Sequence, residues 1–146
     1  MNIVIGSDHG GFELKEYLKE YLKSEGFSLC DMGADSIESV DYPDYAKKVC
    51  EFVLSKEAEF GILVCGSGIG MSMAANRFEG IRAALVSEPL SAELSRRHND
   101  SNVLCLGGRI IGKYMAVKIL EAFLHTSFEG GRHEIRIKKL DNMTEV

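Results

Sequence analysis

A cysteine followed by three closely spaced glycines is the part of this sequence that most directly suggests chemistry. Cys65 opens the segment Gly66-Ser67-Gly68-Ile69-Gly70, between a predicted strand and a predicted helix. Glycines let a ligand approach the backbone closely, and the N–H groups that begin a helix attract anions. The same helix N-terminus stabilises a cysteine thiolate, which can then act as a nucleophile or a base. The alternatives are a tight turn without a ligand and a buried, inert thiol.

A base beside backbone amides is the arrangement that removes a proton next to a carbonyl group. The base takes the proton, and donors already in place stabilise the enediolate oxygen that forms. The loop is not a Walker loop, because no Gly-Lys-Ser/Thr follows, and Met71 stands where G-x-G-x-x-G requires its last glycine. We therefore expect Cys65 to be the base and Gly66–Gly70 to be the anion hole.

Other polar side chains follow or precede the remaining predicted strands. Asp8 and His9 follow the first strand, Arg109 follows the last one, and His98 lies just before it. Ligands of parallel α/β sheets bind beyond the carboxyl ends of the strands, which makes these residues candidates. Alternatively, Asp8 caps the next helix and His98 lies on the surface. Two histidines have no role that the sequence suggests, and we expect both in solvent: His125 and His133.

Short apolar runs alternate along the chain with segments of helical periodicity. The predicted strands are residues 2–6, 27–32, 60–64, 81–86 and 103–106, and the predicted helices are residues 12–23, 43–55, a short one from 71, one from about 90 to 97, and 112–124. A charged segment from Arg132 closes the chain. This alternation predicts right-handed β-α-β units and a parallel sheet covered on both faces. We expect one domain over residues 1–146, a three-layer α/β/α sandwich with a Rossmann-like five-stranded sheet.

Composition and charge exclude several functions. The chain has 146 residues, is 45% hydrophobic and carries a net charge of −5, which is typical of a globular protein and unfavourable for nucleic-acid binding. Five of the seven arginines lie after residue 95, which suits a small anion such as a phosphate. No apolar run approaches the ~18 residues of a membrane span. The absence of such a run leads us to expect a cytoplasmic protein. The four cysteines lack C-x-x-C spacing, so we expect neither a bound metal nor a disulfide framework.

Seven motifs in order resemble the ribose/galactose isomerase family, and within it the type B ribose-5-phosphate isomerases. They are Gly6-Ser7-Asp8-His9-Gly10-Gly11-Phe12, Asp41-Tyr42-Pro43, Cys65-Gly66-Ser67-Gly68-Ile69-Gly70, Ala75-Asn76-Arg77, Gly80-Ile81-Arg82-Ala83, Ser95-Arg96-Arg97-His98-Asn99-Asp100 and Gly130-Gly131-Arg132-His133. The resemblance extends from residue 2 to about residue 136. It implies interconversion of ribose 5-phosphate and ribulose 5-phosphate through a cis-enediolate, without metal or cofactor, as in the pentose phosphate pathway of carbohydrate metabolism.

The resemblance also implies roles for individual residues. Cys65 matches the base, the loop Gly66–Gly70 matches the anion hole with Ser67 beside the substrate oxygens, and His98 matches the group that opens the sugar ring with the help of Asp8. The other positions that match substrate contacts are His9, Arg132 and Arg136 at the phosphate end, together with Tyr42, Gly66, Gly68, Ile69, Gly70, Asn99 and Arg109.

Two features of the family bear on how this chain works. Some relatives use a glutamate a few residues later in place of the cysteine, but no acidic residue lies between Cys65 and Glu79 here, which favours Cys65. The family is dimeric with shared sites. The resemblance therefore implies a homodimer, or a tetramer, in which His98 comes from the partner chain.

The residues alone do not exclude three other functions. A hexose phosphate such as allose or galactose 6-phosphate is the alternative substrate. A non-catalytic module could hold a nucleotide or sugar phosphate on the glycine loop, with Asp31 meeting a ribose at the end of the second strand. Redox chemistry at Cys65 would need a resolving partner, and no second cysteine is near it in sequence.

Overall fold

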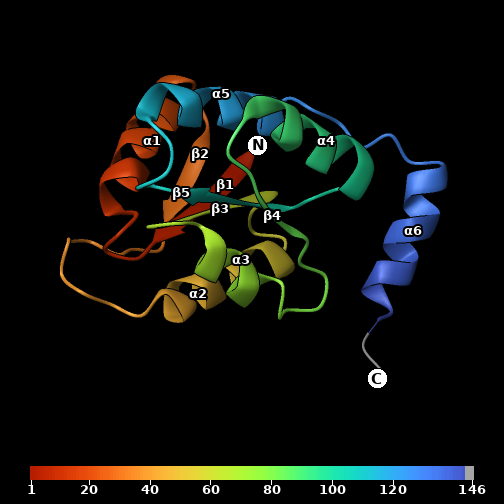
Figure 1. Cartoon of the computed structure of the whole chain (residues 1–146), viewed down its shortest axis with the longest axis horizontal. Helices are drawn as coiled ribbons and strands as arrows, with labels where there is room; N and C mark the ends of the chain where they lie inside the picture. The colour runs from red at the N-terminus through yellow and green to blue at the C-terminus, as the bar shows by residue number, and fades with distance from the viewer. Residues whose placement is uncertain (144–146) are drawn as a thin grey trace.

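A computed structural model describes residues 1–143 and shows a parallel sheet between two layers of helices (Figure 1). The strands are β1 (Asn2–Ser7), β2 (Ser28–Asp31), β3 (Phe60–Cys65), β4 (Ala83–Leu85) and β5 (Val103–Gly107). The helices are α1 (Phe12–Ser24), α2 (Tyr42–Leu54), α3 (Ile69–Ala75), α4 (Pro89–Asn99), α5 (Lys113–Leu124) and α6 (Arg132–Asp141). Helices α1, α4 and α5 cover one face of the sheet, and α2 and α3 cover the other (Figure 1). The predicted three-layer α/β/α fold is confirmed.

The strand order determines where a ligand site can form. The order is β2-β1-β3-β5-β4, with every neighbouring pair parallel. The chain moves from β1 outward to β2 and then returns to place β3 on the other side of β1. A reversal of this kind opens a crevice at the carboxyl ends of the two strands. In the register, Ser7 lies beside Val64 and Cys65 lies beside Gly107, so β1, β3 and β5 end at one edge.

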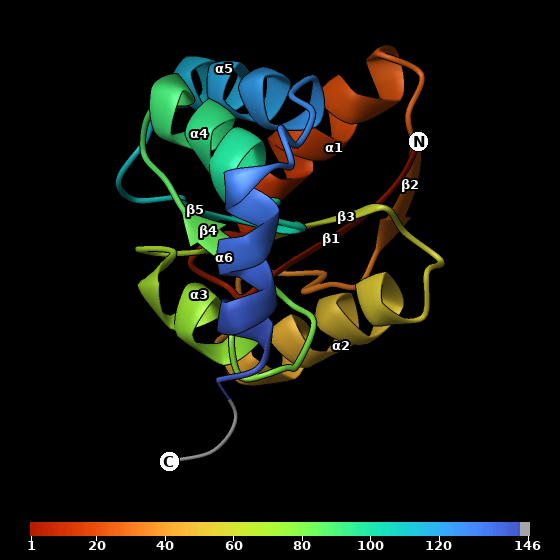
Figure 2. The same ribbon diagram turned by 90° about the vertical axis from the view of Figure 1, so that its right-hand side faces the viewer.

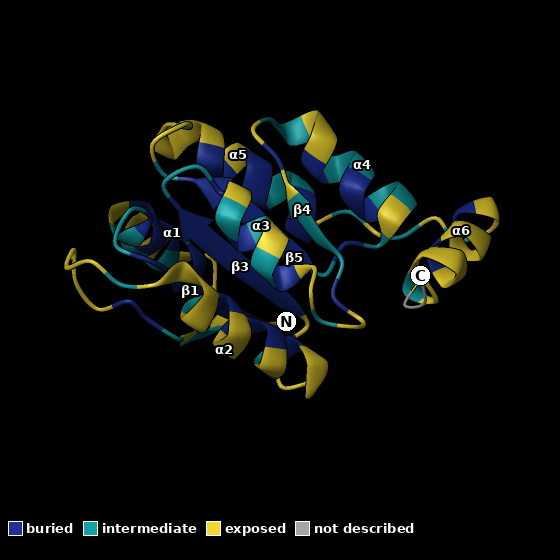
Figure 3. Cartoon of the chain, turned by 60° about the horizontal axis from the view of Figure 1, so that its bottom comes forward, coloured by how far each residue is buried: buried dark blue, intermediate teal, exposed yellow. Residues whose placement is uncertain are grey.

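The core lies on both faces of the sheet, because successive residues of a strand point to opposite faces. Ile3 and Ile5 of β1 pack in a cluster with α1 and α5, whereas Val4 packs in a second cluster with α2. This is why β1, β3 and β5 appear as continuous apolar runs in the sequence. β3 and β5 are buried throughout, as the dark blue of β3 in Figure 3 shows, and β1 is buried after Asn2.

Helix α4 runs from the carboxyl ends of the strands back to their amino ends. It begins at Pro89, after β4, where the Glu88 carboxylate accepts hydrogen bonds from the amides of Leu90 and Ser91. It then runs back to end at Asn99, before β5 begins. The N-terminal end of α4 therefore lies near the carboxyl edge of the sheet, and its C-terminal end lies near the amino edge.

Two elements differ from those that the sequence predicts. Residues 81–86 were expected to form a buried strand, but β4 has three residues, lies at the edge of the sheet and is partly exposed. The charged segment from Arg132 forms a helix, α6, which lies beside α4 and crosses the front of the molecule in Figure 2. Across residues 1–143, none of the helices combines the length and the apolar character that crossing a bilayer demands.

Candidate functional site

Three loops meet at the carboxyl edge of the sheet. The amide of Gly108, after β5, donates to the Cys65 carbonyl at 2.8 Å, and the amide of Arg109 donates to the Gly66 carbonyl at 2.9 Å. After β1, the Asp8 amide donates to the Val64 carbonyl at 3.2 Å. The loops that follow β1, β3 and β5 therefore form one hydrogen-bonded surface at the crevice.

Cys65 ends β3 with its sulfur inside the glycine loop. The Gly68 amide donates a hydrogen bond to the Cys65 Sγ at 3.0 Å. Gly68 can place its amide there because it has a φ of +77°, which glycine adopts without strain. Cys65 is 5% exposed and belongs to the core cluster on the α2 side. In this structure Cys65 is therefore largely shielded from solvent.

The predicted anion hole already has internal hydrogen bonds. The Gly68 amide donates to Cys65 Sγ, and the Ile69 amide donates to Ser67 Oγ at 3.2 Å. An oxyanion in this loop would use the remaining amides, those of Gly66, Ser67 and Gly70, or would replace these two bonds. Ser67 therefore orients the loop through its hydrogen bond with the Ile69 amide.

Asp8 and His9 lie next to the glycine loop. A Cβ atom on Gly10 would come within 3.0 Å of the Gly66 amide nitrogen, which shows how closely the two loops approach. Asp8 is buried, and its Oδ1 accepts a hydrogen bond from the Gly11 amide at 3.1 Å. The bond closes the turn before α1 and is not the helix cap that the sequence left open for Asp8, because the N-cap of α1 is Gly11 and this helix has no side-chain capping bond. The bond uses one carboxylate oxygen.

His9 is held by the loop between β2 and α2. Its Nδ1 accepts a hydrogen bond from the Val40 amide at 3.2 Å. A nitrogen that accepts this bond carries no proton, so the proton of the neutral imidazole lies on Nε2. His9 can therefore offer an Nε2–H donor to an anion.

Tyr42 and Arg109 pack against glycines of the loop. A Cβ atom on Gly70 would lie 2.8 Å from Cζ of Tyr42, and one on Gly66 would lie 3.4 Å from Nη1 of Arg109. A Cβ atom at Gly70 would force the Tyr42 ring to move, whereas one at Gly66 would make an ordinary van der Waals contact with Arg109. We call the residues gathered at this edge the Cys65 group: Asp8, His9, Tyr42, Cys65, Gly66, Ser67, Gly68, Ile69, Gly70 and Arg109.

The other predicted substrate residues lie between α4 and α6, and we call them the His98 group: His98, Asn99, Arg132 and Arg136. His98 and Asn99 are the last two residues of α4, and Arg132 and Arg136 lie one turn apart on α6. A cavity of about 410 Å³ lies between the two helices and is lined in part by His98, Asn99 and Arg136. Arg132, Arg136 and Asn99 are exposed.

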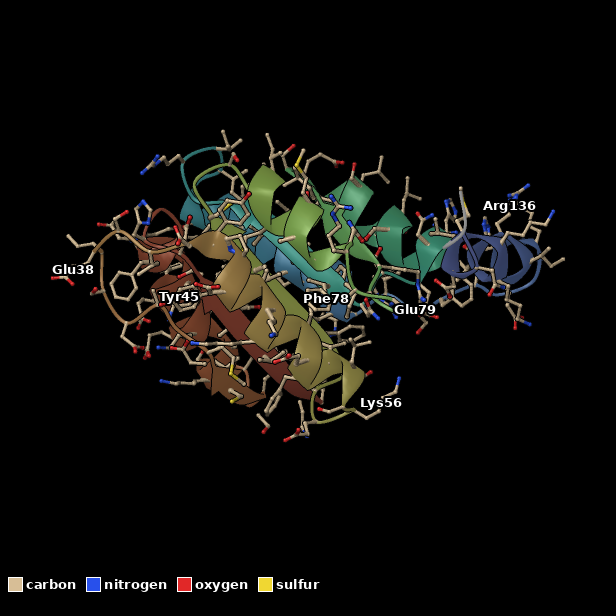
Figure 4. The ribbon with its side chains drawn as sticks, turned by 90° about the horizontal axis from the view of Figure 1, so that it is seen from below. Glu38, Tyr45, Lys56, Phe78, Glu79 and Arg136 are labelled. Carbon is tan, nitrogen blue, oxygen red and sulfur yellow. The ribbon has the colours of Figure 1, made fainter. Side chains whose placement is uncertain are left out.

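The two groups lie at opposite edges of the sheet in one chain. Asn102, three residues after Asn99, accepts a hydrogen bond from the Gly61 amide at the amino end of β3, whereas Cys65 ends that strand. At about 3.3 Å per residue, the six residues of β3 span about 17 Å. In Figure 4, Arg136 lies at one end of the molecule and Glu38, in the loop that holds His9, lies at the other. The structure therefore does not bring the two groups together within one chain.

His133 is buried, contrary to the expectation from the sequence. It was expected in solvent with His125, but His133 is 8% exposed, and its ring stacks on that of His98 with centroids 4.4 Å apart. Burial and then the positive charges of His98, Arg132 and Arg136 lower the pKa of His133, although Glu129 opposes them. The signal was the spacing of His133 and Ile137, which puts both on the buried side of α6.

Glu129 was not predicted as a site residue. Its Oε2 lies 3.5 Å from the His133 Nε2, and its Oε1 accepts a hydrogen bond from the Arg97 Nε at 2.6 Å. It lies just before α6 and thus joins the start of that helix to α4. Arg97 and Glu129 are 32 positions apart, so no local pattern reveals this pair.

Two alternative roles find no support in the geometry. Asp31 does not face a ligand site, because its carboxylate accepts hydrogen bonds from the Lys15 ammonium at 2.8 and 2.9 Å and pairs with Lys19. All four cysteines are free thiols. Burial raises the pKa of Cys50 to about 12 and raises that of Cys105, which makes both poor partners for redox chemistry at Cys65.

Comparison with known proteins identifies close relatives along almost the whole chain. A model of the family described as Ribose/Galactose Isomerase matches residues 3–140. Ribose-5-phosphate isomerase B of Escherichia coli is 47% identical over 138 residues, which are 94% of this chain and 93% of that protein.

Solved structures agree with this similarity. That of a ribose 5-phosphate isomerase from Thermotoga maritima is 57% identical, with a TM-score of 0.96 over 97% of this chain and 98% of that one. That of ribose-5-phosphate isomerase B from Mycoplasma genitalium contains bound ribulose 5-phosphate and is 43% identical, with a TM-score of 0.92 over 96% of this chain and 93% of that one.

Proposed function

This chain belongs to the ribose/galactose isomerase family and is a sugar-phosphate isomerase, and on that premise we propose that it interconverts ribose 5-phosphate and ribulose 5-phosphate. The observation that carries the proposal is the position of Cys65 at the β1–β3 crevice, with the Gly68 amide directed at its sulfur. The complex of the Mycoplasma genitalium relative with ribulose 5-phosphate supports a pentose phosphate as the substrate.

In the proposed reaction, Cys65 moves one proton between two neighbouring carbons. Its thiolate removes the proton from C2 of the open-chain aldose, and the electron pair of that C–H bond forms the C1–C2 double bond of a cis-enediolate. The carbonyl oxygen at C1 gains the negative charge. The same sulfur then returns the proton to C1, while the hydroxyl proton of O2 passes to O1 and the carbonyl forms at C2. No atom is gained or lost.

The glycine loop stabilises the enediolate oxygen. Its backbone amides are fixed before the reaction, so they need no reorganisation when the charge appears. The positive end of the α3 dipole adds to the same effect, because this loop leads directly into α3. Removing one donor of this kind typically raises the barrier by ~2.7–4 kcal/mol.

The His98 group supplies ring opening and phosphate binding in this proposal. His98 exchanges protons with the ring oxygen and the C1 hydroxyl, with Asp8 assisting, and Arg132 and Arg136 hold the phosphate together with His9. A five-carbon sugar phosphate is too short to bridge the length of β3. We therefore propose a homodimer in which the His98 group of one chain faces the Cys65 group of the other.

Replacing Cys65 with alanine tests the proposal. We expect turnover of ribose 5-phosphate to fall by a factor on the order of 10²–10⁴, the usual contribution of a general base. Inorganic phosphate should bind with unchanged affinity in calorimetry, because the phosphate end does not involve the sulfur. Cys30→Ala is the matched control, since Cys30 is a free thiol of β2 and should leave turnover unchanged.

The substrate is tested in parallel with allose 6-phosphate and galactose 6-phosphate. These hexose phosphates are the second candidates, because the family description includes galactose isomerases. A higher kcat/KM for either hexose phosphate would replace the pentose in the proposal. Full turnover in Cys65→Ala would refute the role of the cysteine.

A further inference from the structure

We infer that Arg82 is a positioning residue, which holds α4 and α6 at the spacing needed to bind the substrate phosphate. This inference rests on the proposed function, because it concerns the helices that carry the His98 group. Arg82 touches none of the predicted catalytic side chains. It acts through the ends of the two helices, by a set of contacts that we call the Arg82 network: Arg82, Asp100 and Asp141.

The backbone of Arg82 is fixed to the sheet. Its amide donates to the Asn102 Oδ1 at 2.8 Å, and its carbonyl accepts from the Asn102 amide at 3.0 Å. The Asn102 side chain also donates to the Gly80 carbonyl at 2.8 Å. Because Asn102 leads into β5, the Arg82 side chain extends from a rigid edge of the sheet.

The Arg82 guanidinium binds the C-terminal end of α4. Its Nε donates to the carbonyls of Asn99 and Asp100, at 3.1 and 3.0 Å, and its Nη2 donates to Asp100 Oδ2 at 3.1 Å. The last carbonyls of a helix lack partners within the helix, so these bonds satisfy groups that would otherwise need water. Asp100 has a φ of +45°, which turns the chain away at this point. The contacts fix the backbone next to His98.

The same guanidinium binds the C-terminal end of α6. Its Nη1 donates to Asp141 Oδ2 at 3.2 Å, and Asp141 is the last residue of that helix. The Arg82 side chain is 17% exposed, so solvent screens this pair less than it would a surface ion pair. One planar, five-donor group therefore joins two helix ends that are 41 residues apart in sequence.

Helix α6 depends on a small number of attachments. Figures 1 and 2 show it outside the layered body, with α4 as its neighbour. Apart from the packing of His133 and Ile137, its start is joined to α4 through Glu129 and Arg97, and its end is joined through Asp141 and Arg82. Without the second pair, α6 could turn about its first end.

The position of α6 sets the geometry of phosphate binding. Arg136 lies five residues before Asp141 and lines the 410 Å³ cavity with His98 and Asn99. The cavity is bounded by the two helices that the Arg82 network joins. A small displacement of a binding group weakens its hydrogen bonds to a ligand strongly. Loss of the network should therefore reduce phosphate affinity while the Cys65 group is unaffected.

The test uses Asp141→Asn, which removes one charge from a partly exposed side chain and leaves the shape nearly unchanged. We expect KM for ribose 5-phosphate and the calorimetric Kd of inorganic phosphate to rise together, by about threefold to tenfold, while kcat changes by less than about twofold. Amide hydrogen exchange should quicken in residues 132–141 and stay constant in β3. Glu134→Gln is the matched control, since it breaks the exposed Glu134–Lys138 pair of the same helix and should change none of these.

Arg82→Gln gives a second variant with a distinct expected result. It removes contacts to both helices, so KM should rise at least as much and kcat should also fall, because the backbone beside His98 is released. Unchanged KM and phosphate Kd in Asp141→Asn would overturn the inference, and so would an unchanged exchange rate in α6. If the unmodified protein does not turn over ribose 5-phosphate, the proposed function fails, whereas phosphate affinity and exchange still decide the role of Arg82.

Discussion

Gly68 is the residue whose identity most tightly constrains the site. Its φ is +77°, and a Cβ atom there would lie 2.5 Å from the Leu85 side chain and 2.9 Å from the Leu106 backbone. The Leu85 side chain could move to another rotamer, but the backbone of Leu106 in β5 cannot move. Any other residue would therefore move the amide that donates to Cys65.

Gly68→Ala should lower both stability and activity. We expect a loss of about 3 kcal/mol in the free energy of unfolding, from left-handed strain of about 1–2 kcal/mol and overpacking of about 1–3 kcal/mol. Turnover of ribose 5-phosphate should fall at least tenfold in the protein that remains folded. Urea denaturation and steady-state kinetics measure the two effects.

Gly26→Ala separates strain from overpacking. Gly26 also has a positive φ, of +81°, but nothing lies within 4 Å of the position of its Cβ atom. This variant should lose about 1 kcal/mol from strain alone and keep full activity. Equal losses in the free energy of unfolding for Gly68→Ala and Gly26→Ala would contradict the role given to the Leu106 backbone.

Among the elements, α1 and β2 are joined by a charged cluster. Lys15 of α1 is fully buried, and its ammonium contacts the Asp31 carboxylate at the end of β2, as does that of Lys19. Asp31 also accepts a hydrogen bond from the Gly33 amide at 3.0 Å, and the Gly33 carbonyl accepts one from Ser7. The cluster thus fixes the chain beside the end of β1, just before Asp8.

Asp31→Asn should destabilise the fold, because it leaves a buried ammonium with incomplete compensation. We expect a loss of about 3 kcal/mol at pH 7, near the lower end for breaking a buried pair, since Glu16 also lies near Lys15. Glu20→Gln, which breaks an exposed pair with Lys23, should cost less than about 0.5 kcal/mol. Urea denaturation at one protein concentration compares them.

The stability lost in Asp31→Asn should depend on pH, and this dependence follows from the pKa of Asp31. Burial would raise that pKa, but the hydrogen bonds from Lys15 and Lys19 outweigh burial and lower it. The ionised carboxylate therefore stabilises the fold above the unfolded pKa of about 4, and this contribution is lost as the pH falls through the lower folded value. The difference in the free energy of unfolding between the unmodified protein and Asp31→Asn should become smaller below about pH 4. A difference in the free energy of unfolding that stays constant down to pH 2 would contradict this role of the ionised Asp31 carboxylate.

The elements show what local sequence can and cannot predict. The runs around Val4, Ile62 and Leu104 are buried on both faces, so they are apolar throughout and easily predicted as strands. Residues 81–86 look equally apolar, but β4 lies at the edge of the sheet, and strand order is a property of the whole chain. Helix α6 escaped prediction because it buries only His133 and Ile137, so its periodicity is weak.

The site shows the same contrast. The Cys65 group was predictable, because the carboxyl ends of parallel strands lie at one edge whatever their order. The partners of the side chains were not, since Arg97 meets Glu129 and Arg82 meets Asp141 across long stretches of sequence. The resemblance to the family supplied the role proposed for Arg136, because the charge pattern alone placed this residue only in a basic region.

For the molecule as a whole, the separation of the two groups allows a decisive test of the shared site. Cys65→Ala and His98→Asn should each be inactive alone as homodimers. In a twofold dimer with shared sites, a mixed dimer has one site with both residues intact and one with neither. After unfolding and refolding an equal mixture, we expect about a quarter of the unmodified activity, since half of the dimers are mixed.

The control distinguishes shared sites from separate ones. If each chain held a complete site, the mixture would stay inactive, because every chain would lack one residue. Refolding each variant alone under the same conditions gives the baseline. After refolding an equal mixture of the double variant Cys65→Ala, His98→Asn and the unmodified protein, shared sites should reduce the activity of the unmodified chains by about half, because every site of a mixed dimer lacks one of the two residues.

The length of β3 has a consequence for how assembly and substrate depend on each other. In the proposed dimer, a sugar phosphate that touches the sulfur of one subunit and the arginines of the other binds only the associated form. By linkage, it must strengthen association by the same free energy that association adds to its own binding. Dilution would then favour free subunits that cannot turn over, and a high concentration of metabolite would reassemble them.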